Sequence, residues 1–311
     1  MIKNRYFSDL SDAAATFLTV ANYQEEELIV AENLPEMRRR NWHRDKPAFT
    51  EIQEKYCSLV VEDEIAGVPC LSITPKHLDL NRSNKVMLYF YGGGYMMGSP
   101  EEDLVISAVL AEKLGMRVLS PRYSLAPENI FPIAHDECML VYRSLVDAIG
   151  AQNIIVAGES AGGNMSVSLL LHAHQDGLPM PAAVALLSPW IDLSCDAYDA
   201  AAIFPHDSTL PSQYIEEGSK IYSGSGDPSN PLISPLHGEF GDWFPPVILT
   251  TGTGDCLQHM TRRLAEKLDS AGVEVHLDVW DMLWHVFEFY PDVPEADASL
   301  GHIADFLSDY C

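Results

Sequence analysis

The sequence predicts an α/β fold with a mostly parallel, eight-stranded sheet, helices on both faces and a helical cap. From residue 85 onward, short apolar runs alternate with longer helical patterns. Runs such as VMLYFY, NIIVAG and VALLS are continuously apolar, which is typical of parallel strands that helices bury on both faces. Two segments, residues 1–50 and 190–243, do not fit this alternation, and we expect both to lie over the sheet.

Eight strands are expected from apolar or alternating runs, at 57–63, 68–74, 85–91, 116–120, 153–157, 182–188, 246–251 and 273–280. The first two are joined by a short Glu-Ile-Ala-Gly connection, which favours an antiparallel hairpin at the sheet edge. Helical patterns follow most of the later strands, at 101–114, 134–149, 161–175, 257–271 and 295–309.

The chain divides into a core and two accessory segments. The core is expected at 51–189 and 244–311, amino-terminal cap helices at 1–50, and a cap insertion rich in Pro, Gly, Ser and Asp at 190–243. Because the insertion falls between two core strands, we expect it at the carboxyl edge of the sheet, where open α/β sheets bind ligands.

The composition is that of a soluble globular protein, with 47% hydrophobic and 21% charged residues. A formal net charge of −26, from 45 acidic against 19 basic residues, argues against a nucleic acid or an anionic membrane as partner. The amino terminus lacks an uninterrupted apolar stretch and no segment reaches a membrane-spanning length, so we expect a cytoplasmic location. Six cysteines without paired spacing predict neither a disulfide framework nor a metal site.

The most specific motif is Gly158-Glu-Ser-Ala-Gly162, which follows the strand NIIVA and opens an apolar helix. In a nucleophile elbow, the serine occupies a strained strand-to-helix turn, and flanking glycines avoid collisions with the neighbouring strand and helix. Ser160 would then be exposed near the positive end of the helix. The alternative is a Gly-rich turn in which the serine only caps the helix, but the strand before it and the helix after it favour the elbow.

A serine hydroxyl needs a base within hydrogen-bond reach, and the base needs an acid to orient it. Asp255 follows the strand VILTT and His285 follows the last strand, which matches the chain order serine, acid, histidine that accompanies such an elbow. Considered alone, Asp255 is more typical of a helix N-cap and His285 of a loop histidine. Their joint order and position at one sheet edge favour the catalytic interpretation.

Three consecutive glycines, residues 92–94, follow the strand 85–91. Acyl transfer develops negative charge on the former carbonyl oxygen, and each main-chain N–H donor aimed at that oxygen typically contributes ~3–4 kcal/mol. Glycines can turn their amides toward the serine because they have no side chain in the way. The glycine loop is therefore a candidate oxyanion hole, and Ala161, directly after the serine, offers a further amide.

Together these motifs resemble the bacterial hormone-sensitive-lipase-like carboxylesterases of the α/β-hydrolase fold. The resemblance covers the chain from about residue 57 to the end and rests on GGGYMMGSP, RYSLAPENIFP, GESAGGN, LPMPAAVALLSPWID, Asp255 and WDMLWHVF. It also implies a cap made of the amino-terminal helices and the 190–243 insertion. The site residues that it implies are a catalytic triad of Ser160, Asp255 and His285, and an oxyanion hole from the amides of Gly93, Gly94 and Ala161.

The chain departs from the family pattern at two positions. Tyr91 precedes the glycines where the family usually has His, and Ser124 stands in Tyr-Ser-Leu-Ala-Pro-Glu where the family has Arg. Both belong to the support of the oxyanion loop rather than to the reacting groups. A tyrosine offers one hydroxyl that lies farther from the backbone than the ring nitrogens of histidine, so we expect weaker preorganisation of the loop.

The resulting hypothesis is a serine carboxylesterase that hydrolyses short- to medium-chain esters through an acyl-enzyme on Ser160. It requires no cofactor and no metal, its partner is a small-molecule ester, and a homodimer is left open. Two alternatives also stay open. One is a non-catalytic small-ligand receptor on the same fold, as in the plant gibberellin receptors, and the other is an amidase or lactonase that uses the same triad.

Overall fold

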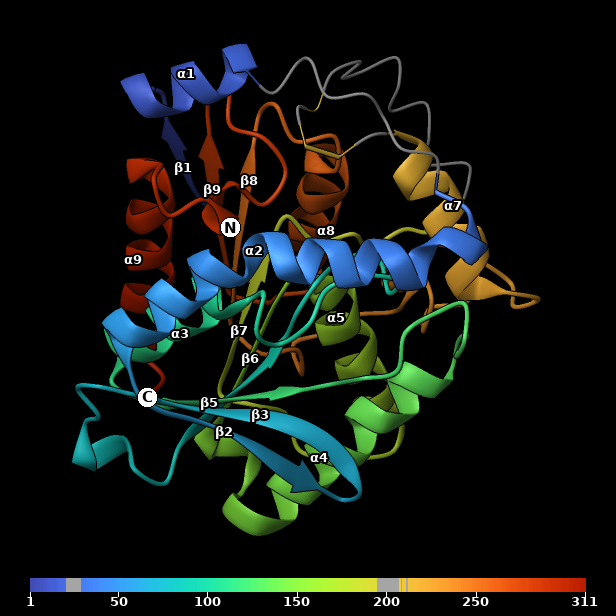
Figure 1. The fold of residues 1–311 in the computed structure, drawn as a ribbon. Helices are drawn as coiled ribbons and strands as arrows, with labels where there is room; N and C mark the ends of the chain where they lie inside the picture. The colour runs from blue at the N-terminus through green and yellow to red at the C-terminus, as the bar shows by residue number, and fades with distance from the viewer. Residues whose placement is uncertain (21–28, 195–206, 208, 211) are drawn as a thin grey trace.

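The described residues form a nine-stranded sheet at the centre of the protein (Figure 1). The computed structural model describes residues 1–20, 29–194, 207, 209, 210 and 212–311. The strand order across the sheet is β1-β9-β8-β7-β6-β4-β5-β3-β2. The strands are β1 Lys3–Phe7, β2 Cys57–Ile65, β3 Val68–Pro75, β4 Val86–Phe90, β5 Arg117–Pro121, β6 Ile154–Glu159, β7 Ala183–Leu187, β8 Val247–Gly252 and β9 Val275–Trp280.

The mostly parallel character of the sheet is confirmed, since only the pairs β2/β3 and β3/β5 are antiparallel. The predicted edge hairpin is also confirmed. It turns through Ala66 and Gly67, whose φ angles are 53° and 83°, as the tight turns that match strand twist require.

The expectation of eight strands is wrong, because the amino-terminal segment begins with a ninth. Strand β1 lies parallel to β9 at the sheet edge. Lys3 Nζ meets a Glu274 carboxylate oxygen at 2.6 Å, and Arg5 makes two 2.6 Å hydrogen bonds to Asp278. A short edge strand whose side chains are mostly exposed carries little apolar pattern, so periodicity does not reveal it.

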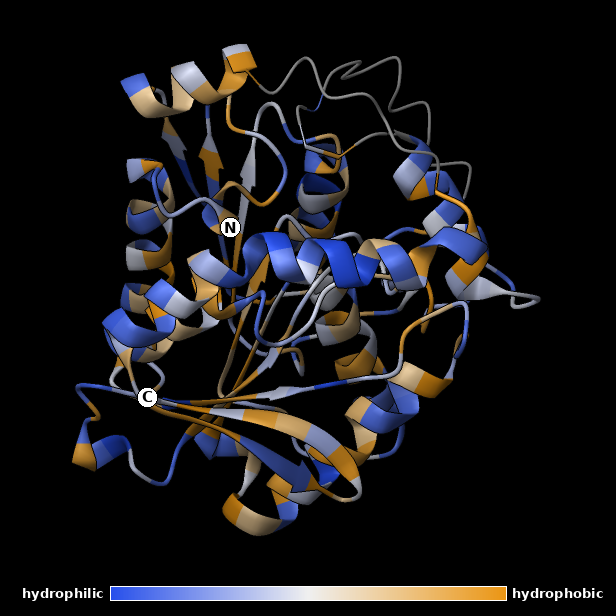
Figure 2. Cartoon of the chain, viewed as in Figure 1, coloured by the Kyte–Doolittle hydropathy of each residue, from blue (hydrophilic) through white to orange (hydrophobic). Residues whose placement is uncertain are grey.

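Helices lie on both sides of the sheet (Figure 1), with α3 packed against α9 and α4 against α5. Apolar residues concentrate on the central strands, whereas polar residues cover much of α2 (Figure 2). Across the described ranges, no helix combines the length and apolarity that crossing a bilayer demands. The helices are α1 Asp12–Val20, α2 Leu34–Tyr56, α3 Leu104–Leu114, α4 Ile133–Ile149, α5 Ser160–Gln175, α7 Ser212–Ser223, α8 Gln258–Ser270 and α9 Pro294–Ser308.

Strand β4 marks the point where the chain reverses its direction across the sheet. The chain runs from β4 to β5 on one side and then crosses to β6 on the other side of β4. Phe90 at the end of β4 pairs with Gly158 near the end of β6. Loops that leave two adjacent parallel strands in opposite directions open a crevice at their carboxyl ends, where α/β sheets bind ligands.

The two accessory segments meet over the loop that follows β4. Arg38 of α2 donates from Nε to the carbonyl of Met96 (2.6 Å) and forms an ion pair with Glu128. Helix α2 continues to Tyr56, past the expected boundary at residue 50. Parts of both predicted cap segments, residues 21–28 and 195–206, lie outside the described residues. The apolar cluster between the segments contains Ile29, Leu34, Met37, Met96 and Met97, with Tyr214 and Ile221 packed against it.

Candidate active site

Ser160 lies at the sharp turn between β6 and α5. Its φ of 49° is in the left-handed region, which non-glycine residues adopt only when their surroundings enforce it. The flanking glycines explain how this turn fits. A Cβ on Gly158 would lie 2.4 Å from the carbonyl oxygen of Gly162, and a Cβ on Gly162 would lie 1.9 Å from that of Phe90. The motif therefore has the elbow geometry that the sequence predicts.

The structure brings Ser160, Asp255 and His285 together in one chain of hydrogen bonds. His285 Nε2 lies 2.9 Å from Ser160 Oγ, and His285 Nδ1 lies 3.0 Å from Asp255 Oδ1. An ionised carboxylate can only accept, so Nδ1 carries the proton toward Asp255 and leaves Nε2 free to accept from the serine hydroxyl. All three residues are buried.

The loops of the acid and the histidine touch through their backbones. A Cβ on Gly252, at the end of β8, would lie 1.9 Å from the carbonyl oxygen of Leu283. The N–H of Gly254 donates to that same carbonyl at 2.8 Å. Two glycines in the segment Gly-Thr-Gly-Asp thus allow the loops after β8 and β9 to approach closely enough for a direct side-chain hydrogen bond.

Burial and the attraction between opposite charges have opposite effects on the pKa values of His285 and Asp255. Burial alone lowers the pKa of His285, but the carboxylate of Asp255 outweighs it, with Asp207 and Glu288 adding in the same direction, so the pKa is raised. Burial alone raises the pKa of Asp255, but the charge of His285 and the hydrogen bonds to the carboxylate lower it overall. The pair therefore favours a carboxylate beside an imidazole that readily takes a proton.

The glycine loop after β4 presents main-chain amides near Ser160. Gly93 and Gly94 have φ angles of 95° and 64°, and a Cβ on Gly93 would lie 2.4 Å from the carbonyl oxygen of Met97. Glycine is therefore needed at position 93 for space as well as for conformation. Within the described parts of the chain, the amides of Gly93, Gly94 and Ala161 donate to no acceptor.

Aromatic side chains hold this loop from both sides. The ring of Tyr91 stacks on that of Tyr123 with centroids 4.2 Å apart, and both side chains are buried. Tyr95 stacks on Tyr222 of α7 at 3.7 Å and donates its hydroxyl to Asn164 Oδ1 at 2.7 Å. Tyr91 is thus held in place by stacking on Tyr123, a contact between two residues that lie in separate sequence motifs.

Ser160 and His285 open into an apolar cavity of about 180 Å³. Its residues come from the glycine loop, the insertion and the loops after β8 and β9. Besides Ser160 and His285, the lining consists of Gly93, Gly94, Glu159, Trp190, Thr209, Leu210, Tyr214, Ile215, Leu257, Val286, Phe289 and Tyr290.

Glu288, which follows His285 closely in the chain, is a buried acid. Glu288 Oε1 accepts hydrogen bonds from Thr250 (3.2 Å) and Ser299 (2.7 Å), while Oε2 has no partner among the described residues. Burial raises the pKa of Glu288 to about 7.

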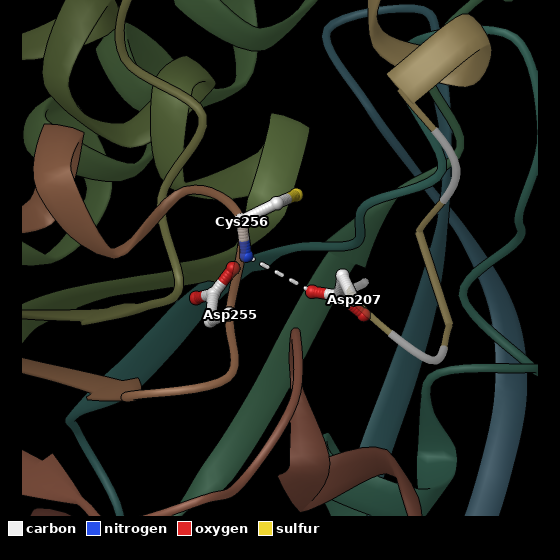
Figure 3. A group of neighbouring side chains, drawn as sticks. All are labelled: Asp207, Asp255 and Cys256. Carbon is white, nitrogen blue, oxygen red and sulfur yellow. Dashed lines mark hydrogen bonds between the residues drawn. The ribbon is translucent and has the colours of Figure 1, made fainter. Parts of the chain in front are cut away.

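Potential metal ligands gather at one place in the described part of the chain. Ligand atoms of Asp207, Asp255 and Cys256 lie within 4.8 Å of one another. Hydrogen bonds account for this proximity, since Asp207 accepts from the Cys256 N–H (Figure 3) and Asp255 accepts from Leu257 and Thr251. Burial raises the pKa of the Cys256 thiol, whereas metals bind the thiolate. Hydrogen bonds within the protein already engage the carboxylate oxygens of Asp207 and Asp255.

Comparison with known proteins gives the family. Residues 87–289 match the family described as the alpha/beta hydrolase fold. The chain is 28% identical to an acetyl-hydrolase of Streptomyces hygroscopicus over 285 residues, which are 88% of this chain and 94% of that protein. It is 30% identical to an esterase of Acinetobacter venetianus over 229 residues, which are 73% of this chain and 75% of that protein.

A similar solved structure is that of a hormone-sensitive lipase from a metagenome library. The TM-score is 0.81 at 32% identity, over 97% of this chain and 99% of that chain. The chain belongs to the α/β-hydrolase fold family, in its group of hormone-sensitive-lipase-like carboxylic ester hydrolases. The fold and the family that the sequence motifs indicate are confirmed.

Proposed function

We propose that this chain is a serine carboxylesterase in which Ser160 is the nucleophile, His285 the general base and Asp255 the residue that orients the imidazole. The observation that carries the proposal is the continuous path of hydrogen bonds, 2.9 Å from Ser160 Oγ to His285 Nε2 and 3.0 Å from Nδ1 to Asp255. In this arrangement a proton can leave the hydroxyl as the oxygen attacks.

The reaction proceeds in two halves. Ser160 Oγ bonds to the ester carbonyl carbon while Nε2 takes its proton, and the resulting oxyanion accepts hydrogen bonds from the amides of Gly93, Gly94 and Ala161. Collapse of this intermediate breaks the bond to the alcohol, which leaves with the proton from His285. Water then attacks the acyl-enzyme by the same route and releases the carboxylic acid.

The cavity supports a preference for short- to medium-chain acyl groups. Its volume of about 180 Å³ lies below the roughly 300–1,000 Å³ of pockets that enclose drug-sized ligands. A cap role for residues 190–243 is supported by Tyr214 and Ile215 of α7, which line the cavity. For residues 1–50 the support is indirect, since an apolar cluster that includes Leu34 and Met37 packs against Tyr214 of the same helix. We expect kcat/KM to be higher for butyrate than for palmitate esters, and the reverse order would contradict this preference.

Replacing the nucleophile tests the mechanism. Ser160→Ala should lower kcat for p-nitrophenyl butyrate by on the order of 10⁶-fold, because the remaining groups only bind and stabilise the oxyanion. Ser168→Ala, which changes another buried serine of α5, serves as the control and should keep the wild-type rate. Activity of Ser160→Ala within a few-fold of the control would exclude this nucleophile.

Two assays separate the alternatives. A fluorophosphonate probe should label Ser160 in a serine hydrolase, whereas a non-catalytic receptor should not react. Matched ester, amide and lactone substrates should give the highest kcat/KM for the ester, and a higher value for the amide or lactone would assign the triad to that reaction instead.

A further inference from the structure

We propose that Asp207 is a positioning residue that holds the loops of Asp255 and His285 at a fixed spacing and ties that spacing to the cap insertion. The inference rests on the proposed function, since it concerns the same triad. Asp207 belongs to the segment between β7 and β8, outside the core elements that carry Ser160, Asp255 and His285.

One carboxylate oxygen of Asp207 bridges the two loops. Its Oδ2 accepts from the main-chain N–H of Cys256 at 3.0 Å and from the main-chain N–H of His285 at 3.2 Å. Figure 3 shows Asp207 reaching from its own segment to the backbone beside Asp255. Because Cys256 directly follows Asp255, an oxygen shared by both amides fixes how far the acid lies from the histidine. Hydrogen bonds to an ionised acceptor are the stronger kind.

The other carboxylate oxygen of Asp207 accepts hydrogen bonds from residues that follow it closely in the chain. Oδ1 accepts from the N–H of Thr209 (2.8 Å), the hydroxyl of Thr209 (2.9 Å) and the N–H of Leu210 (3.1 Å). Thr209 and Leu210 also line the cavity beside Ser160. The carboxylate therefore joins a wall of the cavity to both catalytic loops, so a displacement of that wall would displace the Asp255–His285 pair.

Asp207 also contributes charge. Among the described residues, the acidic groups with the largest effect on His285 are Asp255, Asp207 and Glu288. A negative charge stabilises the imidazolium that forms during acyl transfer. Burial, followed by the proximity of Asp255, raises the pKa of Asp207, as expected for two carboxylates that share one histidine. Loss of the Asp207 charge should therefore lower the pKa of His285.

Two substitutions separate the charge from the bridge. Asp207→Asn removes the charge and keeps the size of the side chain, with one oxygen acceptor that can serve either the bridge or the segment of Asp207. Asp207→Ala removes all of these hydrogen bonds. Asp227 provides a matched control in the same insertion, because Oδ1 of its exposed carboxylate accepts from Ser229 N and Oγ but contacts neither catalytic loop. Asp227→Ala should keep the wild-type kcat.

We expect Asp207→Ala to lower kcat by roughly 10- to 100-fold with little change in KM, because misplacement of a catalytic pair by about 1 Å has this size of effect. Asp207→Asn should recover part of that loss. In Asp207→Asn the acid side of the kcat/KM profile should shift to lower pH, which a purely structural brace would not cause. Rates are expressed per active site titrated with a fluorophosphonate, so that unfolded protein does not count.

The imidazole of His285 provides a readout that needs no turnover. Its titration by NMR, with the signal assigned by its loss in His285→Gln, should give a lower pKa in Asp207→Asn than in wild type. If wild type hydrolyses esters and both Asp207 variants keep its kcat and pH profile, the positioning role is wrong. A lower melting temperature with an unchanged pH profile per titrated site would also overturn it. If wild type hydrolyses no ester, the proposed function fails, while the NMR shift still decides whether Asp207 acts on His285.

Discussion

Tyr91 and Tyr123 exchange a reciprocal pair of hydrogen bonds, in which each hydroxyl donates to the main-chain carbonyl of the other residue. The distances are 3.1 Å from Tyr91 Oη to Tyr123 O and 2.6 Å from Tyr123 Oη to Tyr91 O. Because Tyr91 immediately precedes the glycine loop, the second bond fixes the backbone where the loop begins. A tyrosine pair thus holds the loop in a protein that lacks the usual histidine.

Removing one hydroxyl tests this anchor. Tyr123→Phe should lower kcat several-fold with KM nearly unchanged, because a hydrogen bond of about 1 kcal/mol is lost and the loop amides act mainly in the transition state. Tyr91→Ala, which also removes the stacked ring, should be slower still, and Tyr91→His should be folded and active. Steady-state kinetics per titrated site, with thermal melts, separates catalysis from stability. A full kcat in Tyr91→Ala would show that the pair only stabilises the fold.

The identity of the acid can be tested by comparison with a neighbouring aspartate. Asp255→Asn should lower kcat by on the order of 10⁴-fold, because an amide favours the wrong tautomer of His285. Asp281→Asn should have little effect, since Asp281 binds Thr253 and Tyr6 instead. A large loss in Asp281→Asn together with a small one in Asp255→Asn would reverse the assignment.

The pH dependence follows from the raised pKa of His285. A base must be neutral to accept a proton, so kcat/KM should fall on the acid side as the imidazole becomes protonated. Since the pKa is raised, half of the maximal value should be reached above the ordinary imidazole value of about 6.5. Initial rates across the pH range test this, and a rate that stays constant in acid would exclude histidine as the base.

The raised pKa of Glu288 leads us to expect that the free energy of unfolding depends on pH. The folded protein holds its proton up to a pKa of about 7, whereas the ordinary value is 4.5. Between these values the unfolded state binds fewer protons, so stability falls as pH rises and the loss is complete above the folded pKa. Glu288→Gln avoids this loss, which amounts to at most about 3 kcal/mol.

Thermal melts in mild acid and at mildly alkaline pH test whether stability falls as pH rises. The advantage of Glu288→Gln over wild type should appear on the alkaline side and disappear in acid. An advantage of equal size at both ends would mean that the substitution acts through packing and not through the buried charge.

The sheet could be predicted because burial on both faces leaves continuous apolar runs in the sequence. The positions of Ser160, Asp255 and His285 could be predicted for a related reason, since each follows a strand and the fold gathers strand ends at one edge. Their distances of 2.9 and 3.0 Å come only from the structure, and their roles stay predictions.

Other contacts left no trace in the sequence. Asp207 binds main-chain amides of Cys256 and His285, and an amide is the same whatever side chain it carries. Tyr91 lies in the loop after β4 and Tyr123 in the loop after β5, and each donates its hydroxyl to the main-chain carbonyl of the other. Neither residue type therefore predicts the presence of the other. Contacts of this kind depend on which distant segments of the chain the fold brings together. Periodicity and motif spacing do not predict that placement.

The pairing of β1 with β9 constrains the order in which the sheet can assemble. Arg5 and Asp278, which join β1 to β9, are 273 positions apart in the chain, so β1 leaves the ribosome on the order of tens of seconds before its partner strand exists. Charged side chains on a short edge strand, here Lys3 and Arg5, disfavour pairing with the strands of other chains. Strand β9 can therefore gain its outer neighbour only once it has itself been made, and that neighbour is a segment made 273 positions earlier.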